Sequence, residues 1–313
     1  MLERLVPNVR QLSADDLDIG VRAQAARAHT SSLPDAPQVE ATDPRVEEII
    51  RLARIYGGVL LSGPPGTSKS YYAAAAAAVM SGGHPSRVRF VQFHASYQYE
   101  DFVLGFSPTE TGFTTKPGPF LALVEAACED ADHEYVLVVD ELSRADVGRV
   151  FGEALTYVER SKREQEFTVA NGIEIRVPNN LVILATMNPF DRGVDEVDAA
   201  FERRFAKVTM DPDPAALTSM LEANGMDPTL QARLLAWFRS INERARNNPA
   251  AAVGHAYFVT ASDEESLRDI WNYQLQYLVQ RAFRREESTR ADVTTRWHHI
   301  FDAVGTSNPG TGS

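Results

Sequence analysis

A glycine- and proline-rich loop, GPPGTSKS, is the part of the sequence best suited to binding phosphate groups. It directly follows the β-type run VLLS and directly precedes the alanine-rich run YYAAAAAAVM, as a phosphate-binding loop between a strand and a helix requires. Backbone N–H groups can surround a β-phosphate, Lys69 can neutralise phosphate oxygens, and the Ser70 hydroxyl can ligate Mg2+. Ser68 stands where the usual motif has glycine, and it is a small residue that fits the same loop. The predicted nucleotide-binding residues are Gly63, Pro64, Pro65, Gly66, Thr67, Ser68, Lys69, Ser70 and Tyr71.

Two adjacent carboxylates end a second apolar run further along the chain. The run YVLVV is followed by Asp140 and Glu141. In an open α/β sheet the carboxyl ends of the strands face the ligand crevice. We therefore expect Asp140 to hold Mg2+ together with Ser70, and Glu141 to polarise the water that attacks a terminal phosphate.

Polar residues also follow the next predicted strand and a short predicted helix. Asn188 comes after the strand LVILAT, where its amide can orient the attacking water, but asparagine is equally common there as a turn residue. Arg203 and Arg204 follow a short helix predicted over residues 198–202. A solvated helix end explains these arginines from charge alone, whereas an arginine donated across a subunit interface would stabilise charge on a γ-phosphate. The catalytic candidates are Glu141, Asn188, Arg203 and Arg204.

Alternating strand and helix patterns must position these residues. The order of predicted elements is VLLS, YYAAAAAAVM, VRFVQF, a helix over 119–131, YVLVVD, a helix over 147–160, and LVILAT. This alternation is typical of a parallel sheet with helical crossovers. Residues alternate on both sides of Asn171 and Gly172, a dipeptide favoured in tight turns, which predicts a β-hairpin. After residue 211, leucine and aromatic residues recur at helical spacings, which predicts an α-helical lid.

These patterns divide the chain into four parts. Ser13 and Asp16 predict the start of a helix that continues to about residue 28 and is followed by linker-like sequence. Asp43 and Pro44 supply the cap and first-turn proline of the next helix. The predicted parts are an N-terminal helix and linker over 1–43, a nucleotide-binding domain over 44–211, a helical lid over 212–304 and a flexible tail over 305–313.

The composition is that of an ordinary soluble protein. No apolar run is long enough to cross a membrane, and the first residues lack the apolar stretch of a secretory signal. Cys128 is the single cysteine, which excludes an internal disulfide and fits a reducing compartment, so we expect a cytoplasmic location. A net charge of −12 argues against a broad DNA-binding surface. We therefore expect any DNA contact to be local or supplied by a partner.

Several motifs together resemble the McrB-type branch of AAA+ motors, the nucleotide-driven subunits of modification-dependent restriction systems. The likeness extends from Gly57 to Phe258 and is carried by GPPGTSKS, FHASYQYEDFVLGF, VVDELSRADVGRVFGEAL, ATMNPFDRGVDEVDAAFERRF and GHAYF. Its most specific element is MNPFDR followed by RRF. Ser143 departs from the family pattern, which has asparagine there, and nothing in the short N-terminal region looks like a modified-base reader. Target recognition is therefore expected to come from elsewhere.

This resemblance implies an α/β fold with an αβα P-loop NTPase core, a parallel sheet and a helical lid. It also implies hydrolysis of ATP, or of GTP as the alternative, with Mg2+, at sites shared between the subunits of a homo-oligomeric, hexameric ring. The ring would drive a separate nuclease or regulatory subunit in DNA restriction or phage defence. DNA would be reached through that partner or through the pore of the ring.

The resemblance also assigns roles by position. Asn188 would be the polar sensor, and Asp191 and Arg192 would belong to the interface motif MNPFDR. Arg203 and Arg204 would reach into the neighbouring subunit's site. The hairpin at Asn171 and Gly172 would face the centre of the ring or the partner. His255, Tyr257 and Phe258 resemble the family's lid motif, although packing in a helical core explains them equally well.

Two other functions remain open. A MoxR-type protein-remodelling chaperone shares the DEL-x-R pattern, the ATMNP-like strand end and a lid of similar size. A non-catalytic nucleotide switch would use Glu141 and the arginines only for interface structure, and the intact carboxylate pair argues against it. The sequence contains no guanine-reading N/T-K-x-D tetrapeptide, so ATP is the default, but McrB-like motors can use GTP without it.

Overall fold

A five-stranded parallel sheet forms the centre of the nucleotide-binding part of the chain. The computed structural model describes residues 43–110, 112–190 and 199–302. The strands are β1 (Gly58–Ser62), β2 (Val88–Gln92), β5 (Tyr135–Asp140), β8 (Leu181–Met187) and β9 (Ala206–Thr209). Their order is β2-β5-β8-β1-β9, and every neighbouring pair is parallel. The predicted parallel sheet is confirmed, and its carboxyl ends lie along one edge.

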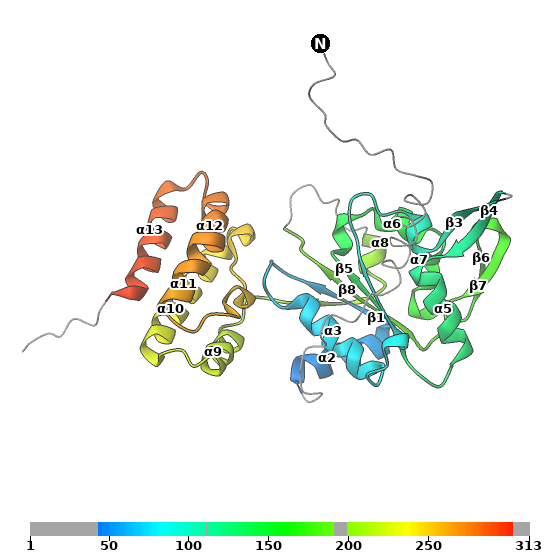
Figure 1. The fold of residues 1–313 in the computed structure, drawn as a ribbon, viewed down its shortest axis with the longest axis horizontal. Coiled ribbons are helices and arrows are strands. Elements are labelled where there is room, and N and C mark those ends of the chain that lie inside the picture. The colour runs from blue at the N-terminus through cyan, green and yellow to red at the C-terminus, as the bar shows by residue number, and fades with distance from the viewer. Residues whose placement is uncertain (1–42, 111, 191–198, 303–313) are drawn as a thin grey trace, which may run out of the picture. The chain divides into compact units, whose positions relative to one another are not determined.

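Helices cover both faces of this sheet (Figure 1). They include α2 (Pro44–Tyr56), α3 (Lys69–Met80), α5 (Pro119–Glu129), α6 (Val147–Phe151) and α8 (Ala199–Glu202). Leu137 and Val139 of β5 belong to a hydrophobic cluster with Phe120 of α5 and Phe151 of α6, while Val136 is equally buried on the opposite face. On that opposite face, α2 and α3 pack on each other and on β1. The layers are therefore α, β and α, as predicted.

Helix α3 approaches the sheet through a run of small residues. It contacts β1, β5 and β8, and its residues 73–77 are consecutive buried alanines. Because alanine adds only a methyl group, the helix backbone can lie near the sheet without a gap. The first residue of this helix is Lys69, so the same packing places the end of the phosphate-binding loop.

The helix predicted over residues 147–160 is interrupted in the structure. Gly152 has φ 52° and ψ −131°, which no helix accommodates, and a Cβ there would lie 2.7 Å from the ring of Tyr99. The chain instead forms α6, then α7 (Ala154–Tyr157), then a 3-10 turn over Arg160–Lys162. The prediction of one continuous helix is wrong for two reasons. Gly152 adopts a positive-φ conformation that favours glycine, and its lack of a Cβ leaves space for the ring of Tyr99.

Two antiparallel hairpins accompany the main sheet. The predicted hairpin is confirmed as β6 (Glu166–Val169) and β7 (Ile173–Arg176), with Asn171 at φ 63° and Gly172 at φ 73°. A second hairpin, β3 (Leu104–Thr109) and β4 (Gly112–Pro117), follows the short helix α4 (Tyr99–Phe102). This hairpin was not predicted from the sequence, because the residues of β4 are all exposed and show no alternation of buried and exposed side chains.

A buried arginine joins the base of the β6–β7 hairpin to the main sheet. The guanidinium of Arg163 donates to four backbone carbonyls, those of Val158, Pro178, Leu181 and Gly57. Burial lowers the pKa of Arg163 to about 10, so the side chain stays charged at neutral pH. The carbonyls therefore compensate a cation that is removed from water.

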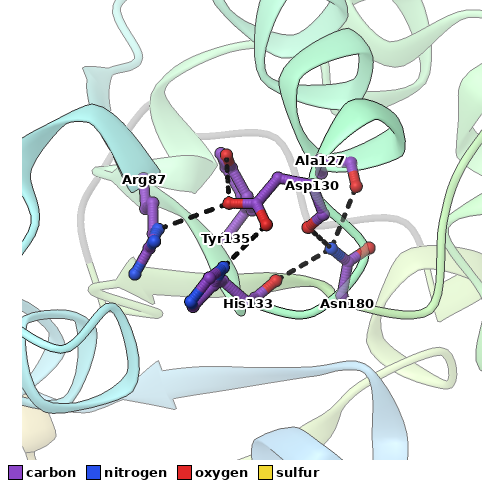
Figure 2. Close-up of polar contacts among 6 residues, drawn as sticks. All are labelled: Arg87, Ala127, Asp130, His133, Tyr135 and Asn180. Atoms are coloured by element: carbon purple, nitrogen blue, oxygen red, sulfur yellow. Dashed lines mark hydrogen bonds and ion pairs between the residues drawn. The ribbon is translucent and has the colours of Figure 1, made fainter.

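Polar side chains fasten the loop between α5 and β5. The Asp130 carboxylate accepts hydrogen bonds from His133 Nδ1 at 2.6 Å and from the Tyr135 hydroxyl at 3.1 Å, and Arg87 Nε lies 3.6 Å away (Figure 2). The hydrogen bond from His133 is the largest cause that lowers the pKa of Asp130. Beside this cluster, the amide of Asn180 lies 2.8 to 3.0 Å from three carbonyls of the same loop, those of Ala127, Asp130 and His133. The loop is thereby held to the start of β8.

The chain after β9 is helical among the residues described. Its helices are α9 (Pro214–Ala223), α10 (Pro228–Ala245), α11 (Glu264–Ile270), α12 (Gln276–Ala282) and α13 (Glu287–His298), with a π-helical turn over Trp271–Leu275. They enclose a second hydrophobic cluster in which Trp271 and Trp297 stack and Trp237 meets both edge-on. No helix in the described ranges has the length and hydrophobicity needed to cross a bilayer.

Several predicted residues lie outside the described ranges. The predicted features outside these ranges are the helix that begins near Ser13, the interface residues Asp191 and Arg192, and the tail over 305–313.

Candidate functional site

The loop between β1 and α3 folds around its own lysine. Lys69 Nζ donates to the carbonyl of Gly63 at 2.9 Å and to that of Pro64 at 2.7 Å. Thr67 Oγ1 donates to the same Pro64 carbonyl at 2.9 Å. Gly63 must be glycine, because a Cβ would lie 2.1 Å from the carbonyl oxygen of Met210 after β9. The ammonium group thus lies within the loop that the sequence assigns to phosphate binding.

Hydroxyl and carboxylate oxygens meet where α3 faces the carboxyl end of β5. Ser70 Oγ donates to Asp140 Oδ1 at 2.6 Å, and Thr186 Oγ1 donates to the same oxygen at 2.5 Å. Mg2+ prefers hard oxygen ligands and keeps several positions for water or phosphate. Ser70 and Asp140 together fit this preference, because they place two such oxygens at one point beside the loop.

Thr186 was not among the predicted site residues. It is buried in β8, next to the end of β5, and its hydroxyl also accepts from the Glu141 backbone N–H at 3.3 Å. Parallel pairing of Val139 with Ala185 sets this neighbour relationship. The register of two strands could have identified it, since the residues after that pair are Asp140 and Thr186.

Glu141 adopts a left-handed backbone conformation, with φ 55° and ψ 42°. Such a conformation costs a non-glycine residue of order 1 kcal/mol and is maintained by its surroundings. Here the bond to Thr186 and the ion pair from Arg144 Nε to Glu141 Oε2, at 3.4 Å, accompany it. Because both side chains of that pair are substantially exposed, the pair adds little to stability. It does orient the carboxylate at the edge of the site.

Asn188 is buried at the carboxyl end of β8. Its side-chain carbonyl accepts a hydrogen bond from Phe190 N at 3.1 Å, which is the turn contact that asparagine commonly makes after a strand. The structure therefore places Asn188 at the same sheet edge as Asp140 and Glu141, with its carbonyl oxygen turned toward its own chain.

The two predicted arginines differ in environment. The side chain of Arg204 is 8% exposed, and its Nε lies 3.9 Å from Glu159 Oε2 of the same chain. Arg203 is exposed. Of this pair, Arg203 is the residue whose side chain is accessible to another molecule.

A short helical turn after α10, η6 (His255–Phe258), packs directly on the phosphate-binding loop. Ala256 N donates to Gly66 O at 2.8 Å, and a Cβ on Gly66 would lie 2.9 Å from the ring of Tyr257. His255 Nε2 lies 3.0 Å from Ser68 Oγ. Phe258, by contrast, is fully buried in the helical core. The GHAYF motif therefore divides into residues that touch the loop and one that packs in the lid.

The chain is similar to known proteins in the region that carries this site. Residues 58–205 match the AAA domain of the dynein-related subfamily. The chain is 31% identical over 258 residues to the EcoKMcrB subunit of the type IV methyl-directed restriction enzyme of Escherichia coli (strain K12), which covers 76% of this chain and 56% of that protein. Residues 58–205 are therefore an AAA domain of the dynein-related subfamily, of the McrB type.

A second relative of this McrB-type AAA domain is the component YdiS of the type II restriction enzyme BsuMI of Bacillus subtilis (strain 168). It is 28% identical over 188 residues, which cover 47% of this chain and 55% of YdiS. The chain thus spans little more than half the length of either relative. Among solved structures, NtrX from Brucella abortus in complex with ADP aligns with 91% of the chain and 73% of its own length, at 15% identity and a TM-score of 0.40.

Within this McrB-type AAA domain, most of the predicted site residues lie together. The phosphate-binding loop, Asp140, Glu141 and Asn188 share the edge formed by the carboxyl ends of β1, β5 and β8. Tyr71 lies in the first turn of α3 and is exposed. The arrangement can hold a nucleotide's phosphates and a divalent cation between α3 and β5, and it places a carboxylate next to them.

Proposed function

We propose that this chain hydrolyses a nucleoside triphosphate, ATP or GTP, using Mg2+ held by Ser70 and Asp140. The observation that carries the proposal is the 2.6 Å contact between Ser70 Oγ and Asp140 Oδ1, directly after the lysine of the loop. Mg2+ held by Ser70 and Asp140 would neutralise the charge that develops on the phosphate oxygens. The family assignment, which covers this segment, supports the same activity.

Each residue of the site has a part in this proposal. Lys69 exchanges its contacts with the loop carbonyls for phosphate oxygens. Thr186 fixes the orientation of Asp140, and Glu141 takes the proton of the attacking water. Arg144 would hold Glu141 until that water is in place. Asn188 orients the water if its amide nitrogen faces the site.

We further propose that the chain works as a ring of identical subunits, which the resemblance to McrB-type motors implies is hexameric. The nucleotide-binding domain would extend to residue 211 and the lid from 212 to 304. Arg203 would enter the neighbouring subunit's site, because it is exposed, while Arg204 is held by Glu159 and supports it from within. Asp191 and Arg192 would belong to the same interface.

The output of this ring is proposed to be work on a separate effector subunit, a nuclease or a regulator, in DNA restriction or phage defence in the cytoplasm. Both relatives are components of restriction enzymes, and this chain spans little more than half of each. Recognition of DNA would then come through the partner or the ring pore, since the net charge is −12.

The test is steady-state hydrolysis of ATP and GTP by the purified chain over a range of protein concentrations. Activity per subunit should rise with concentration if sites are shared. Glu141→Gln and Arg203→Ala should each abolish turnover. Mixing the two inactive variants should restore part of it, because some interfaces in the mixed rings then combine an intact Glu141 from one subunit with an intact Arg203 from its neighbour. Arg51→Ala, which changes an exposed arginine on α2, serves as the matched control.

Two results would contradict the proposal. If the chain binds nucleotide but does not hydrolyse it, either alone or together with a partner subunit, it is a nucleotide switch. Turnover that is independent of concentration and of Arg203 would exclude shared sites.

A further inference from the structure

Ser68 occupies a backbone conformation that rarely suits a side chain. Its φ is 61° and its ψ is 24°, in the left-handed region, and it immediately precedes the first residue of α3. Glycine adopts this conformation without cost, whereas serine is held in it only by its surroundings. Its carbonyl accepts the hydrogen bond of Tyr72 N at 3.0 Å, so this strained residue begins the helix that presents the loop.

The contact that accompanies this strain comes from the lid turn η6. Ser68 Oγ lies 3.0 Å from His255 Nε2, although the two residues are far apart in the sequence. The other ring nitrogen, Nδ1, accepts a hydrogen bond from the backbone N–H of Asp213 at 3.2 Å. Because a neutral imidazole has one donor and one acceptor, the proton is on Nε2 and is donated to Ser68.

The surroundings of His255 favour this neutral form. The residue is 3% exposed, and burial lowers the pKa of its imidazole. The charged groups that face it are the Asp213 carboxylate, which caps α9, and Arg45 of α2, and their effects on the pKa have opposite signs. A second ring proton would also point at the Asp213 N–H, which is itself a donor. Protonation therefore breaks the arrangement.

We propose that His255 is a positioning residue of the nucleotide site, which holds Ser68, and with it the phosphate-binding loop, in the conformation that receives phosphate groups. This inference rests on the proposed nucleotide chemistry of the loop and adds a specific connection from the lid. Beside the backbone hydrogen bond from Ala256 to Gly66, it links the lid to the loop through a side-chain hydrogen bond that requires serine at position 68. The ligand concerned is the diphosphate portion of a nucleotide.

The proposal predicts the opposite pH dependence from simple electrostatics. A histidine that becomes positively charged near a phosphate should strengthen binding in acid. If His255 acts by holding Ser68, acid should instead weaken binding, because the protonated ring loses its hydrogen bond from Asp213. The decisive comparison is therefore the direction of the change in affinity between pH 7.5 and pH 5.5.

The experiment is a double-mutant cycle on the full chain, with affinity for a fluorescent ADP analogue measured in Mg2+. When Ser68 is present, His255→Ala should weaken binding of the ADP analogue by about threefold to tenfold, the range expected when one hydrogen bond is lost. In the Ser68→Gly background the same change should have less than about a twofold effect, because glycine needs no anchor. His255→Gln, which retains a donor and an acceptor but does not titrate, should restore binding and remove the loss in acid. His84→Ala, at an exposed histidine, is the control.

Independent effects of Ser68→Gly and His255→Ala, or tighter binding in acid, would overturn the inference while leaving the hydrolytic function intact. A chain that shows the expected coupling but hydrolyses neither ATP nor GTP would instead overturn the proposed function alone. NMR of the 15N-labelled histidine rings in nucleotide-free protein gives a second readout. The His255 ring should carry its proton on Nε2, and its signal should move in Ser68→Gly. A proton on Nδ1 would also refute the inference.

Discussion

Gly254 immediately precedes the lid turn and lies close against the phosphate-binding loop. A Cβ built on this glycine would lie 2.0 Å from Gly66 O and 2.6 Å from Pro65 O. The backbone of Gly254, with φ −73° and ψ 155°, is one that alanine adopts freely. Gly254→Ala therefore tests the contact itself, without introducing backbone strain.

The size of the effect follows from these distances. Real Cβ atoms essentially never come closer than 3.0 Å to such an atom, so the two segments must separate by at least about 1 Å. The same movement would lengthen the bond from Ala256 N to Gly66 O from 2.8 Å to about 3.8 Å, beyond hydrogen-bonding range. It would also break the contact between His255 and Ser68. Two lost hydrogen bonds correspond to about 1 to 3 kcal/mol, or about fivefold to a hundredfold in affinity.

Isothermal titration with ADP and Mg2+ measures this loss, and thermal unfolding checks that the variant is folded. Gly148→Ala is the matched control, because its Cβ would meet only Asp146 Oδ1, at 3.4 Å, in helix α6. We expect the control to bind ADP within about twofold of wild type, since nothing near the loop moves. A folded Gly254→Ala protein with wild-type affinity would refute the reasoning, since the loop would then bind nucleotide without the lid turn.

Three further predictions concern stability. Arg163→Met should lower the free energy of unfolding by about 2 to 5 kcal/mol in urea titrations, because it leaves buried carbonyls without a donor; an effect below about 1 kcal/mol would contradict this. Asn180→Ala should cost about 1 to 3 kcal/mol by the same measurement, while Asn179→Ala, at an exposed neighbour, should cost little; equal effects would show that the three carbonyl contacts are unimportant. The lowered pKa of His255 means that the unfolded chain binds this proton more readily than the folded chain, so stability should fall as pH drops below the ordinary value of 6.5. His255→Gln should reduce that fall, and an unchanged pH profile would exclude His255 as its source.

The features that could be predicted depend on short-range sequence patterns. The phosphate-binding loop is determined by its glycines, lysine and serine between a strand and a helix, all within one stretch of chain. Asp43 was predicted to begin a helix, and its carboxylate accepts from Arg45 N at 2.8 Å and from Val46 N at 3.4 Å. The turn at Asn171 and Gly172 was predicted from the conformational freedom of those two residues. In each case the interacting atoms lie within a few residues of one another.

The features that were missed depend on contacts between distant segments. Gly152 interrupts a helix because the Tyr99 ring occupies the adjacent space, and nothing in the sequence near Gly152 reveals that neighbour. Thr186 binds Asp140 only because β5 and β8 are adjacent in register. Whether His255 packs in the lid or contacts the loop could not be decided until Ser68 was seen beside it. Arg203 and Arg204 are neighbours in sequence, yet Arg203 is exposed and the side chain of Arg204 is buried beside Glu159.

The run of alanines in α3 makes the geometry of the phosphate site depend on residues that never touch a ligand. Those alanines set the spacing between the helix and the sheet, and the same helix carries Lys69 and Ser70 at its first turn. Because Ala74 and Ala76 are buried, a bulkier side chain at either would displace the helix, and with it Lys69 and Ser70, relative to Asp140, whose carboxylate is held by Thr186 of the sheet. The affinity of the site for nucleotide could therefore be tuned by substitutions at buried residues of α3 that do not contact the nucleotide.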